Sequence, residues 1–128
     1  MANAAFDYRY FINAPAYRIY AHLAQPENYV GLSPLVVAVS EIEQGADSAG
    51  IGFFRYRSVE RFHFLGLIRY DNLLRVTITL TKPNQQMISE VDSPFSVNVR
   101  FIFDFEPGDG GTWIVETISA QMPLIVKG

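Results

Sequence analysis

The chain has 128 residues, of which 49% are hydrophobic and 18% are charged, and this composition predicts one compact domain over residues 1–128. A net charge of −3 excludes a broad cationic surface for nucleic acid, and the absence of cysteine excludes thiolate nucleophiles, iron–sulfur clusters and disulfides. No segment has the pattern of a signal peptide or the ~20 apolar residues of a membrane helix, so we expect a cytoplasmic protein without membrane insertion.

The N-terminal segment predicts a half-buried strand over residues 5–13. Hydrophobic side chains stand at every second position, which is the period of a strand with one buried face. These side chains are Phe6, Tyr8, Tyr10 and Ile12.

Two short helices are expected to follow that strand. Asn13 offers a capping side chain, and Pro15 fits a first helical turn because its missing N–H breaks no hydrogen bond there. An apolar stripe spaced i, i+3, i+4 and i+7 faces the core, with Arg18, His22 and Gln25 lying away from it. The stripe consists of Ala16, Ile19, Tyr20 and Leu23. Pro26 ends this helix, and residues 27–32 predict one or two further helical turns.

The rest of the chain predicts strands separated by turns rich in glycine, proline and asparagine. The expected strands cover residues 35–43, 51–64, 68–80, 87–92, 95–106 and 112–122, and the turns include residues 44–50, 82–86 and the PGDGG hairpin loop at 107–111. Because one short helical region cannot cover both faces of so long a sheet, the sheet must curl around a single core. We therefore predict an α+β fold with a curved antiparallel sheet of about six to seven strands.

Strand parity predicts which side chains point inward. On the inner side we expect Phe54, Tyr56, Ser58, Glu60, Phe62, Phe64, Tyr70, Asn72, Val99, Phe101, Phe103, Phe105 and Glu116. The opposite face of residues 51–64 carries Arg55, Arg57 and Arg61, and we interpret it as a solvated face balanced by acidic residues on neighbouring strands.

Four local sequences occur in a characteristic order. They are NAPAYRIYAHL at 13–23, Leu35-Val36-Val37 after Pro34, GIGFFRYR at 50–57 and GGTWIVETISAQMP at 110–123. Together with the order of elements, they resemble the START-like or Bet v 1-like superfamily (SRPBCC), in particular its bacterial polyketide cyclase/dehydrase and lipid-transport branch. The resemblance implies a helix-grip fold, in which a seven-stranded antiparallel sheet wraps around a long C-terminal helix and an apolar cavity forms between them.

The sequence departs from this family after Pro123, where five residues leave room for one helical turn at most. The long C-terminal helix of the family is therefore expected to be absent from this chain. An open face carrying Phe101, Phe103 and Phe105 would exceed the apolar patch that a soluble monomer normally shows. We expect a helix continuing from Pro123 outside this sequence, or a second copy of the chain in a homodimer, to cover it.

Metal and nucleotide chemistry lack their usual motifs. His22 and His63 are far apart and form neither HxxxH nor HxH, so we predict no metal site. The sequence has no G-x-S-x-G, no P-loop and no G-x-G-x-x-G, and we predict no cofactor.

An inward carboxylate is the most informative feature for function. Burying the Glu60 carboxylate among aromatic residues costs free energy unless it is paired, hydrated or bound to a ligand. The alternative is a β-bulge that turns Glu60 outward. The same argument applies to Glu116. If the domain is an enzyme, Glu60 with Tyr56 or Tyr70 could supply the acid and base of an aldol cyclisation and dehydration.

Three functions stay open at this point. The first is a binding or carrier module for a small hydrophobic or amphipathic molecule of lipid, polyketide or isoprenoid type. The second is a polyketide cyclase, aromatase or dehydratase, and the third is a protein-interaction module. The expected ligand-binding residues are Tyr8, Tyr10, Phe54, Tyr56, Ser58, Glu60, Tyr70, Asn72, Phe101, Phe103 and Glu116.

Overall fold

The computed structural model describes residues 2–30, 36–64, 68–92 and 98–122. The strands are β1 (Ala2–Ile12), β2 (Val36–Ala46), β3 (Gly52–Phe64), β4 (Ile68–Lys82), β5 (Gln86–Asp92), β6 (Asn98–Gly108) and β7 (Gly111–Met122). The helical elements are α1 (Ala16–Leu23) and the 3₁₀ helix η1 (Pro26–Tyr29). These elements confirm the predicted α+β class.

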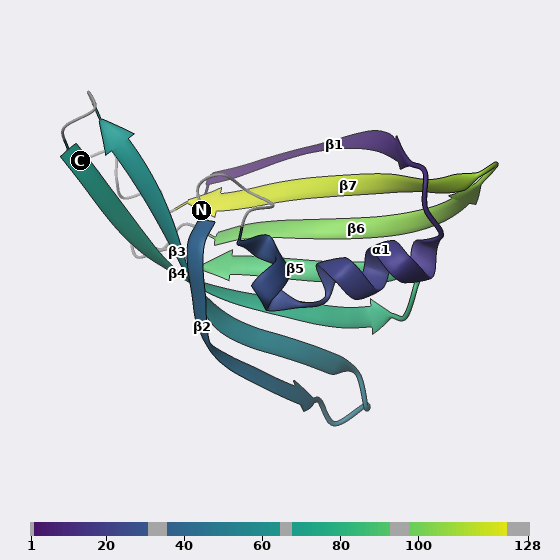
Figure 1. The fold of residues 1–128 in the computed structure, drawn as a ribbon, viewed down its shortest axis with the longest axis horizontal. Coiled ribbons are helices and arrows are strands. Elements are labelled where there is room, and N and C mark those ends of the chain that lie inside the picture. The colour runs from purple at the N-terminus through teal and green to yellow at the C-terminus, as the bar shows by residue number, and fades with distance from the viewer. Residues whose placement is uncertain (1, 31–35, 65–67, 93–97, 123–128) are drawn as a thin grey trace.

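All seven strands form one antiparallel sheet with the order β1-β7-β6-β5-β4-β3-β2 (Figure 1). From β2 to β7 each strand pairs with the next one in the chain, as expected when short turns connect neighbours. β1 instead pairs with β7, from Ala2 opposite Met122 to Ile12 opposite Thr112. The first and last strands are therefore neighbours, and β1 and β2 form the two edges.

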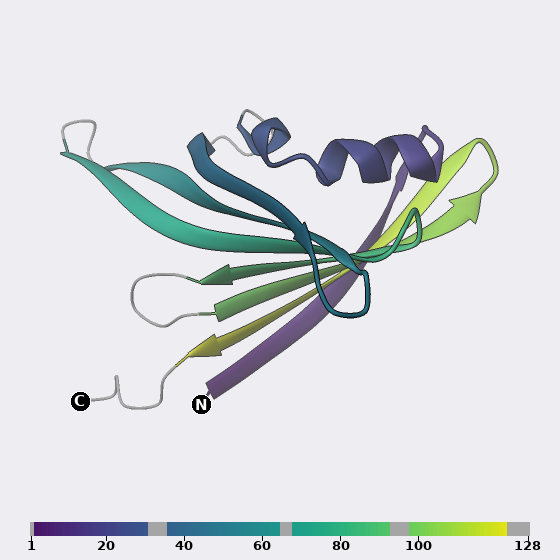
Figure 2. The same cartoon turned by 90° about the horizontal axis from the view of Figure 1, so that it is seen from below.

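The sheet is strongly curved, and α1 and η1 lie over its concave face (Figure 2). Ile19 and Tyr20 are the buried residues of α1. The Tyr20 ring meets Phe105 edge-on at 5.3 Å between centroids, and its hydroxyl donates a hydrogen bond to the Gln86 carbonyl at 2.8 Å. The core is therefore the layer between the helix and the sheet, and it consists of Ile19, Tyr20, Ala24, Phe54, Tyr56, Leu74, Val76, Ile78, Met87, Phe105 and Ile114.

The start of α1 differs from the prediction. Pro15 precedes the helix in an extended conformation, and no side chain, Asn13 included, caps the helix. The Pro15 carbonyl accepts hydrogen bonds from the Arg18 and Ile19 amides. The turn is held instead from across the fold, since the Thr112 hydroxyl donates a hydrogen bond to the Ala14 carbonyl at 2.8 Å.

Other boundaries differ from the prediction too: β1 begins at Ala2, β4 ends at Lys82 and β6 ends at Gly108. The second helical element is a single 3₁₀ turn that begins at Pro26, because proline fits the start of a helix. β2 extends to Ala46, so the predicted turn at 44–50 is shorter. Within this turn, the Asp47 carboxylate accepts hydrogen bonds from the Ala49 and Ile51 amides at 2.8 and 3.0 Å, and these bonds hold the turn closed.

The phenylalanine stripe of β6 is partly covered from within the chain. Phe105 is only 6% exposed because α1 packs on it, so the prediction that an outside helix or a second copy covers this residue is wrong. Val99, Phe101 and Phe103 are half-buried, and their cover by a helix continuing from Pro123 or by a second copy stays a prediction. Phe95, Val97 and residues 123–128 lie outside the described residues.

Among the described residues, α1 is the only α-helix, and no helix there is long and apolar enough to cross a membrane.

Candidate ligand-binding groove

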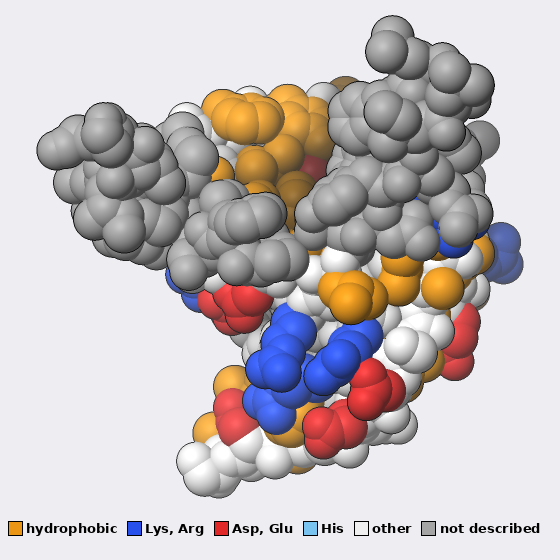
Figure 3. Space-filling view, turned by 90° about the vertical axis from the view of Figure 1, so that its left-hand side faces the viewer, with side chains coloured by type: hydrophobic (Ala, Val, Ile, Leu, Met, Phe, Trp, Pro, Cys, Tyr) orange, Lys and Arg blue, Asp and Glu red, His pale blue; other side chains and the backbone are white. Residues whose placement is uncertain are grey.

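Two adjoining hollows lie on the concave face of the sheet. The larger, which we call the helix-side hollow, has a volume of about 830 Å³ and lies between α1, β1 and β7. The smaller, which we call the sheet-side hollow, has a volume of about 350 Å³ and is lined by residues from β2 to β7 and η1. Tyr29, Phe103 and Glu116 line both hollows, so the two form one open groove. Figure 3 shows hydrophobic side chains gathered around a hollow at one end of the molecule.

The sheet-side hollow is mostly apolar, because it collects the inward side chains of neighbouring strands. Its apolar residues are Val36, Leu74, Val76, Val91, Val99, Phe101 and Phe103. Its polar residues are Tyr29, Tyr56, Ser58, Glu60, Ser89 and Glu116.

Glu60 lines the sheet-side hollow from β3. The pairing of β3 with β4 runs through Glu60 opposite Asn72 without a shift, whereas the register shift lies in β2, between Val36 and Ala38. The alternative of a bulge that turns Glu60 outward is therefore wrong. Burial raises the pKa of Glu60 above its usual value. Within the described part of the chain, no group is hydrogen-bonded or ion-paired to its carboxylate.

Glu116 is the buried polar centre of the groove, with 8% of its surface exposed. The pairing of β1 with β7 places Tyr8 directly opposite it. The Tyr8 hydroxyl donates a hydrogen bond to one carboxylate oxygen at 2.8 Å, and the Tyr10 hydroxyl donates to the other at 3.0 Å.

The phenols around Glu116 are held in their neutral form. Partial burial, together with the hydrogen bond to Glu116 and its charge, raises the pKa of Tyr8 to about 12. Burial and then the charge of Glu116 also raise the pKa of Tyr10. Both phenols are therefore hydrogen-bond donors to the carboxylate at neutral pH.

The helix-side hollow adds residues that the sequence analysis did not assign to a site. Arg18 and His22 on α1 line it although both are exposed, and the sequence analysis placed them away from the core. Tyr29 of η1 lines it as well, with its hydroxyl donating a hydrogen bond to the Leu23 carbonyl at 2.6 Å. Burial raises the pKa of Tyr29 above its usual value.

The structure brings most of the expected site residues to this groove. Those that line it are Tyr8, Tyr10, Tyr56, Ser58, Glu60, Phe101, Phe103 and Glu116. Phe54 instead belongs to the core, with 8% of its surface exposed. The side chains of Tyr70 and Asn72 lie outside the described part of the structure.

Among the polar residues of the sheet-side hollow that the sequence analysis missed, Ser89 had a local signal and Tyr29 had none. Ser89 has the same parity as Met87 and Val91 on β5, so strand alternation could have placed it inward. Tyr29 belongs to a single 3₁₀ turn without a repeating pattern, and no local signal marked it.

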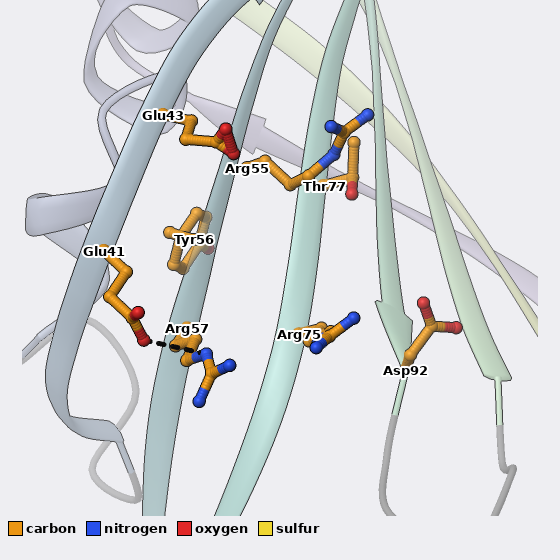
Figure 4. A pocket seen from close by; sticks show the side chains of 8 residues that line it. All are labelled: Glu41, Glu43, Arg55, Tyr56, Arg57, Arg75, Thr77 and Asp92. Atoms are coloured by element: carbon orange, nitrogen blue, oxygen red, sulfur yellow. Dashed lines mark ion pairs between the residues drawn. The ribbon is translucent and has the colours of Figure 1, made fainter.

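The convex face carries a charged hollow of about 400 Å³ over β2 to β5 (Figure 4). Arg57 and Arg75 are direct cross-strand neighbours, and the next partner of Arg75 is Asp92. Arg57 forms an ion pair with Glu41 at 2.8 Å. Acidic residues of β2 and β5 thus balance the arginines, in agreement with the predicted solvated face.

Metal ligands do not gather in the described residues, where no three His, Asp or Glu side chains lie close enough to hold an ion.

No protein-family model and no curated protein sequence matches this chain. Solved structures do resemble it. The Zhui aromatase/cyclase from Streptomyces is 17% identical with a TM-score of 0.73, over 95% of this chain and 70% of that chain. A START superfamily protein from Mycobacterium smegmatis is 14% identical with a TM-score of 0.70, over 97% of this chain and 81% of that one. Ara h 8.0201 is 13% identical with a TM-score of 0.69, over 98% of this chain and 86% of that one.

At these identities the likeness concerns the fold. In this chain the fold consists of the seven-stranded curved antiparallel sheet and the helical segment after the first strand. The chain therefore has a fold like that of these START, Ara h 8 and aromatase/cyclase structures.

Proposed function

We propose that this protein is a binding or carrier module that holds one small apolar or amphipathic molecule, of lipid, polyketide or isoprenoid type, in the concave groove. One observation carries the proposal. The groove combines hollows of about 350 and 830 Å³ with a mainly apolar lining and a few inward polar groups. This is the usual composition of sites for small molecules, in which apolar surface supplies affinity and few polar groups fix orientation.

Binding is the simplest role for the buried polar groups. Glu116 already has two hydrogen-bond donors from β1, and Glu60 faces the hollow from β3. Neither arrangement requires a bond to be made or broken in the ligand. Both groups can orient the polar end of a ligand whose body packs on Phe101 and Phe103.

Native mass spectrometry tests the proposal. The protein is measured as purified and after incubation with long-chain alcohols, fatty acids and naphthyl compounds. We expect a complex with one ligand per chain. Ser89→Phe should fill the sheet-side hollow and weaken binding by about tenfold or more, since about 1.4 kcal/mol corresponds to each tenfold.

Ser119→Phe is the matched control because Ser119 lines a separate polar hollow on the opposite face of the sheet. Circular dichroism and urea unfolding verify that each variant folds, and Ser58→Leu serves as a second groove variant. The proposal is wrong if the wild-type protein binds none of these compounds, or if folded Ser89→Phe and Ser58→Leu bind as tightly as the wild type.

A cyclase, aromatase or dehydratase is the second candidate. It is favoured by Glu60, a carboxyl group with a raised pKa, lining the same hollow as the Tyr56 phenol. A carboxyl group with a raised pKa keeps its proton at a higher pH than a free carboxyl group, which suits a general acid. The likeness to the Zhui aromatase/cyclase supports this candidate at the level of the fold.

Turnover of a poly-β-ketone mimic separates the two functions. If Glu60 is an acid–base catalyst, Glu60→Gln should lower the rate by roughly 10²–10⁴. If the protein only binds, Glu60→Gln should change affinity or selectivity, and the wild type should show no turnover.

A further inference from the structure

The charged side chains that line the sheet-side hollow are all acidic among the described residues. Its hydrogen-bonding side chains are two carboxylates, two phenols and two serine hydroxyls, namely Glu60, Glu116, Tyr29, Tyr56, Ser58 and Ser89. Lys, Arg and His are missing among the described residues that line it. The hollow therefore holds two acidic groups without a basic side chain beside them.

The phenols next to Glu116 are already used by the protein. Tyr8 and Tyr10 both donate to Glu116, and the Tyr29 hydroxyl donates to a backbone carbonyl of α1. A carboxylate has about four lone-pair sites, so the two phenols leave roughly half of the acceptor capacity of Glu116 open. Glu116 can therefore still accept hydrogen bonds from a ligand, whereas the hydroxyl protons of Tyr8, Tyr10 and Tyr29 are already donated within the protein.

Glu60 adds acceptor capacity at the same hollow. Its carboxylate faces the groove from β3, and no described group donates to it. In the register of the sheet, Glu60 lies between Val36 of β2 and Asn72 of β4, and apolar side chains of β4 and β6 line the hollow around it. A ligand donor that reached Glu60 would form a charge-assisted hydrogen bond in apolar surroundings, where such bonds are strong.

The basic groups of the groove lie elsewhere. Arg18 and His22 line the helix-side hollow from α1, and neither lines the sheet-side hollow. An acidic ligand would therefore meet like charge at the sheet-side end, which opposes binding, while a ligand cation there would meet opposite charge.

We infer that the sheet-side hollow selects molecules whose polar group donates hydrogen bonds, preferring a protonated amine to a hydroxyl and rejecting a carboxylate. The inference rests on the proposed function, because it names the ligand class for that same groove. The bound molecule is then oriented with its hydrogen-bond donor at Glu60 and Glu116 and its apolar body against Phe101 and Phe103.

Three compounds with one aromatic body test this selectivity. Naphthylethylamine, naphthylethanol and naphthylacetic acid differ in their polar group, and isothermal titration at neutral pH gives their affinities. We expect the amine to bind about tenfold more tightly than the alcohol, and the acid to bind more weakly than both, since one charge-assisted contact is worth about a factor of ten.

Glu60→Gln should remove most of the preference for the amine over the alcohol, because it should weaken binding of the amine much more than binding of the alcohol. Glu116→Gln is the second variant, and Glu43→Gln on the convex face removes one negative charge outside the groove as the matched control. The inference is overturned if the acid binds as tightly as the amine, or if folded Glu60→Gln and Glu116→Gln keep the preference of the wild type. Failure of all three compounds to bind would instead contradict the proposed function.

Discussion

At the scale of single residues, the groove depends on how carboxylates are kept in apolar surroundings. Glu116 is buried, and each of its carboxylate oxygens accepts a hydrogen bond from one phenol of β1. Glu60 is half-buried and no described group is hydrogen-bonded to it. The hydrogen bonds to Glu116 stabilise the fold. The partial burial of Glu60 costs free energy, and a ligand that donates a hydrogen bond to Glu60 can offset this cost.

The two phenols should contribute unequally to stability. Tyr10→Phe is expected to lower the free energy of unfolding by about 1.5–3 kcal/mol, the usual worth of a hydrogen bond to a charged group. Tyr8 is 46% exposed, so water can replace its hydroxyl and Tyr8→Phe should cost less. Urea unfolding measures both. Equal losses, or a loss for Tyr10→Phe that persists unchanged in a Glu116→Gln background, would contradict this account of the pair.

Glu60 should make the fold less stable as the pH rises. Its pKa in the folded protein lies above the value of 4.5 for the free group, so the folded state binds more protons than the unfolded state. The stability from this group is complete below about pH 4.5 and is lost as the pH rises through the raised value.

Glu60→Gln does not titrate, so we expect it to melt at a higher temperature than the wild type at pH 7. The difference should vanish below about pH 4.5. Thermal unfolding followed by circular dichroism from pH 4 to pH 8 measures it, with Glu43→Gln as the control for the loss of one charge. A variant that is less stable than the wild type at pH 7 would show that Glu60 has a stabilising partner.

At the scale of elements, α1 is the cover of the core and one wall of the groove. The helix has eight residues, too few for a stable helix in water, so packing on the sheet must hold it. Ile19 and Tyr20 provide that packing, and Tyr20 also joins α1 to β5 through the Gln86 carbonyl. The position of Arg18 and His22 in the groove therefore depends on two neighbouring residues.

Ile19→Ala is expected to lower the free energy of unfolding by about 2–5 kcal/mol, because it deletes buried side-chain volume between α1 and the sheet. Tyr17→Ala is the matched control on the same helix, since Tyr17 is 59% exposed and such changes usually stay within about 0.5 kcal/mol. Urea unfolding compares the two variants. A small effect of Ile19→Ala would mean that α1 is not held by this contact.

The hairpin between β6 and β7 depends on a close approach to β1. A Cβ added at Gly111 would clash with the Ile12 carbonyl oxygen and would lie 2.7 Å from the Phe11 ring. Gly111→Ala should therefore cost about 1–3 kcal/mol in urea unfolding. Gly110→Asn is the control, because Gly110 has open space and a φ of +77° that asparagine tolerates. Equal losses at both positions would attribute the effect to the turn itself.

At the scale of the whole molecule, ligand binding should stabilise the fold, because the groove exists only when the sheet is folded. A ligand that binds only the folded state at a hundred times its Kd adds about 2.7 kcal/mol to the free energy of unfolding. We expect this gain in urea unfolding with naphthylethylamine, and a smaller gain for Ser89→Phe at the same concentration. An unchanged midpoint despite measured binding would show that the compound also binds the unfolded chain.

The amino-acid sequence by itself determined the strands and their inward faces. The period of two along β3, β6 and β7 placed Glu60, Phe103 and Glu116 on the inner side, because side-chain direction in a strand depends only on local parity. The helix after β1 also followed from a local apolar stripe. These features need no knowledge of distant contacts.

Only the tertiary structure decided how these residues combine. The pairing of β1 with β7 brings Tyr8 and Tyr10 to Glu116 across more than a hundred residues, and α1 covers Phe105. Local periodicity says nothing about which strand lies beside which, since many pairings bury the same faces. The two phenol donors at Glu116, the hollow beside Glu60 and the place of Arg18 and His22 in the groove therefore follow only from the tertiary structure.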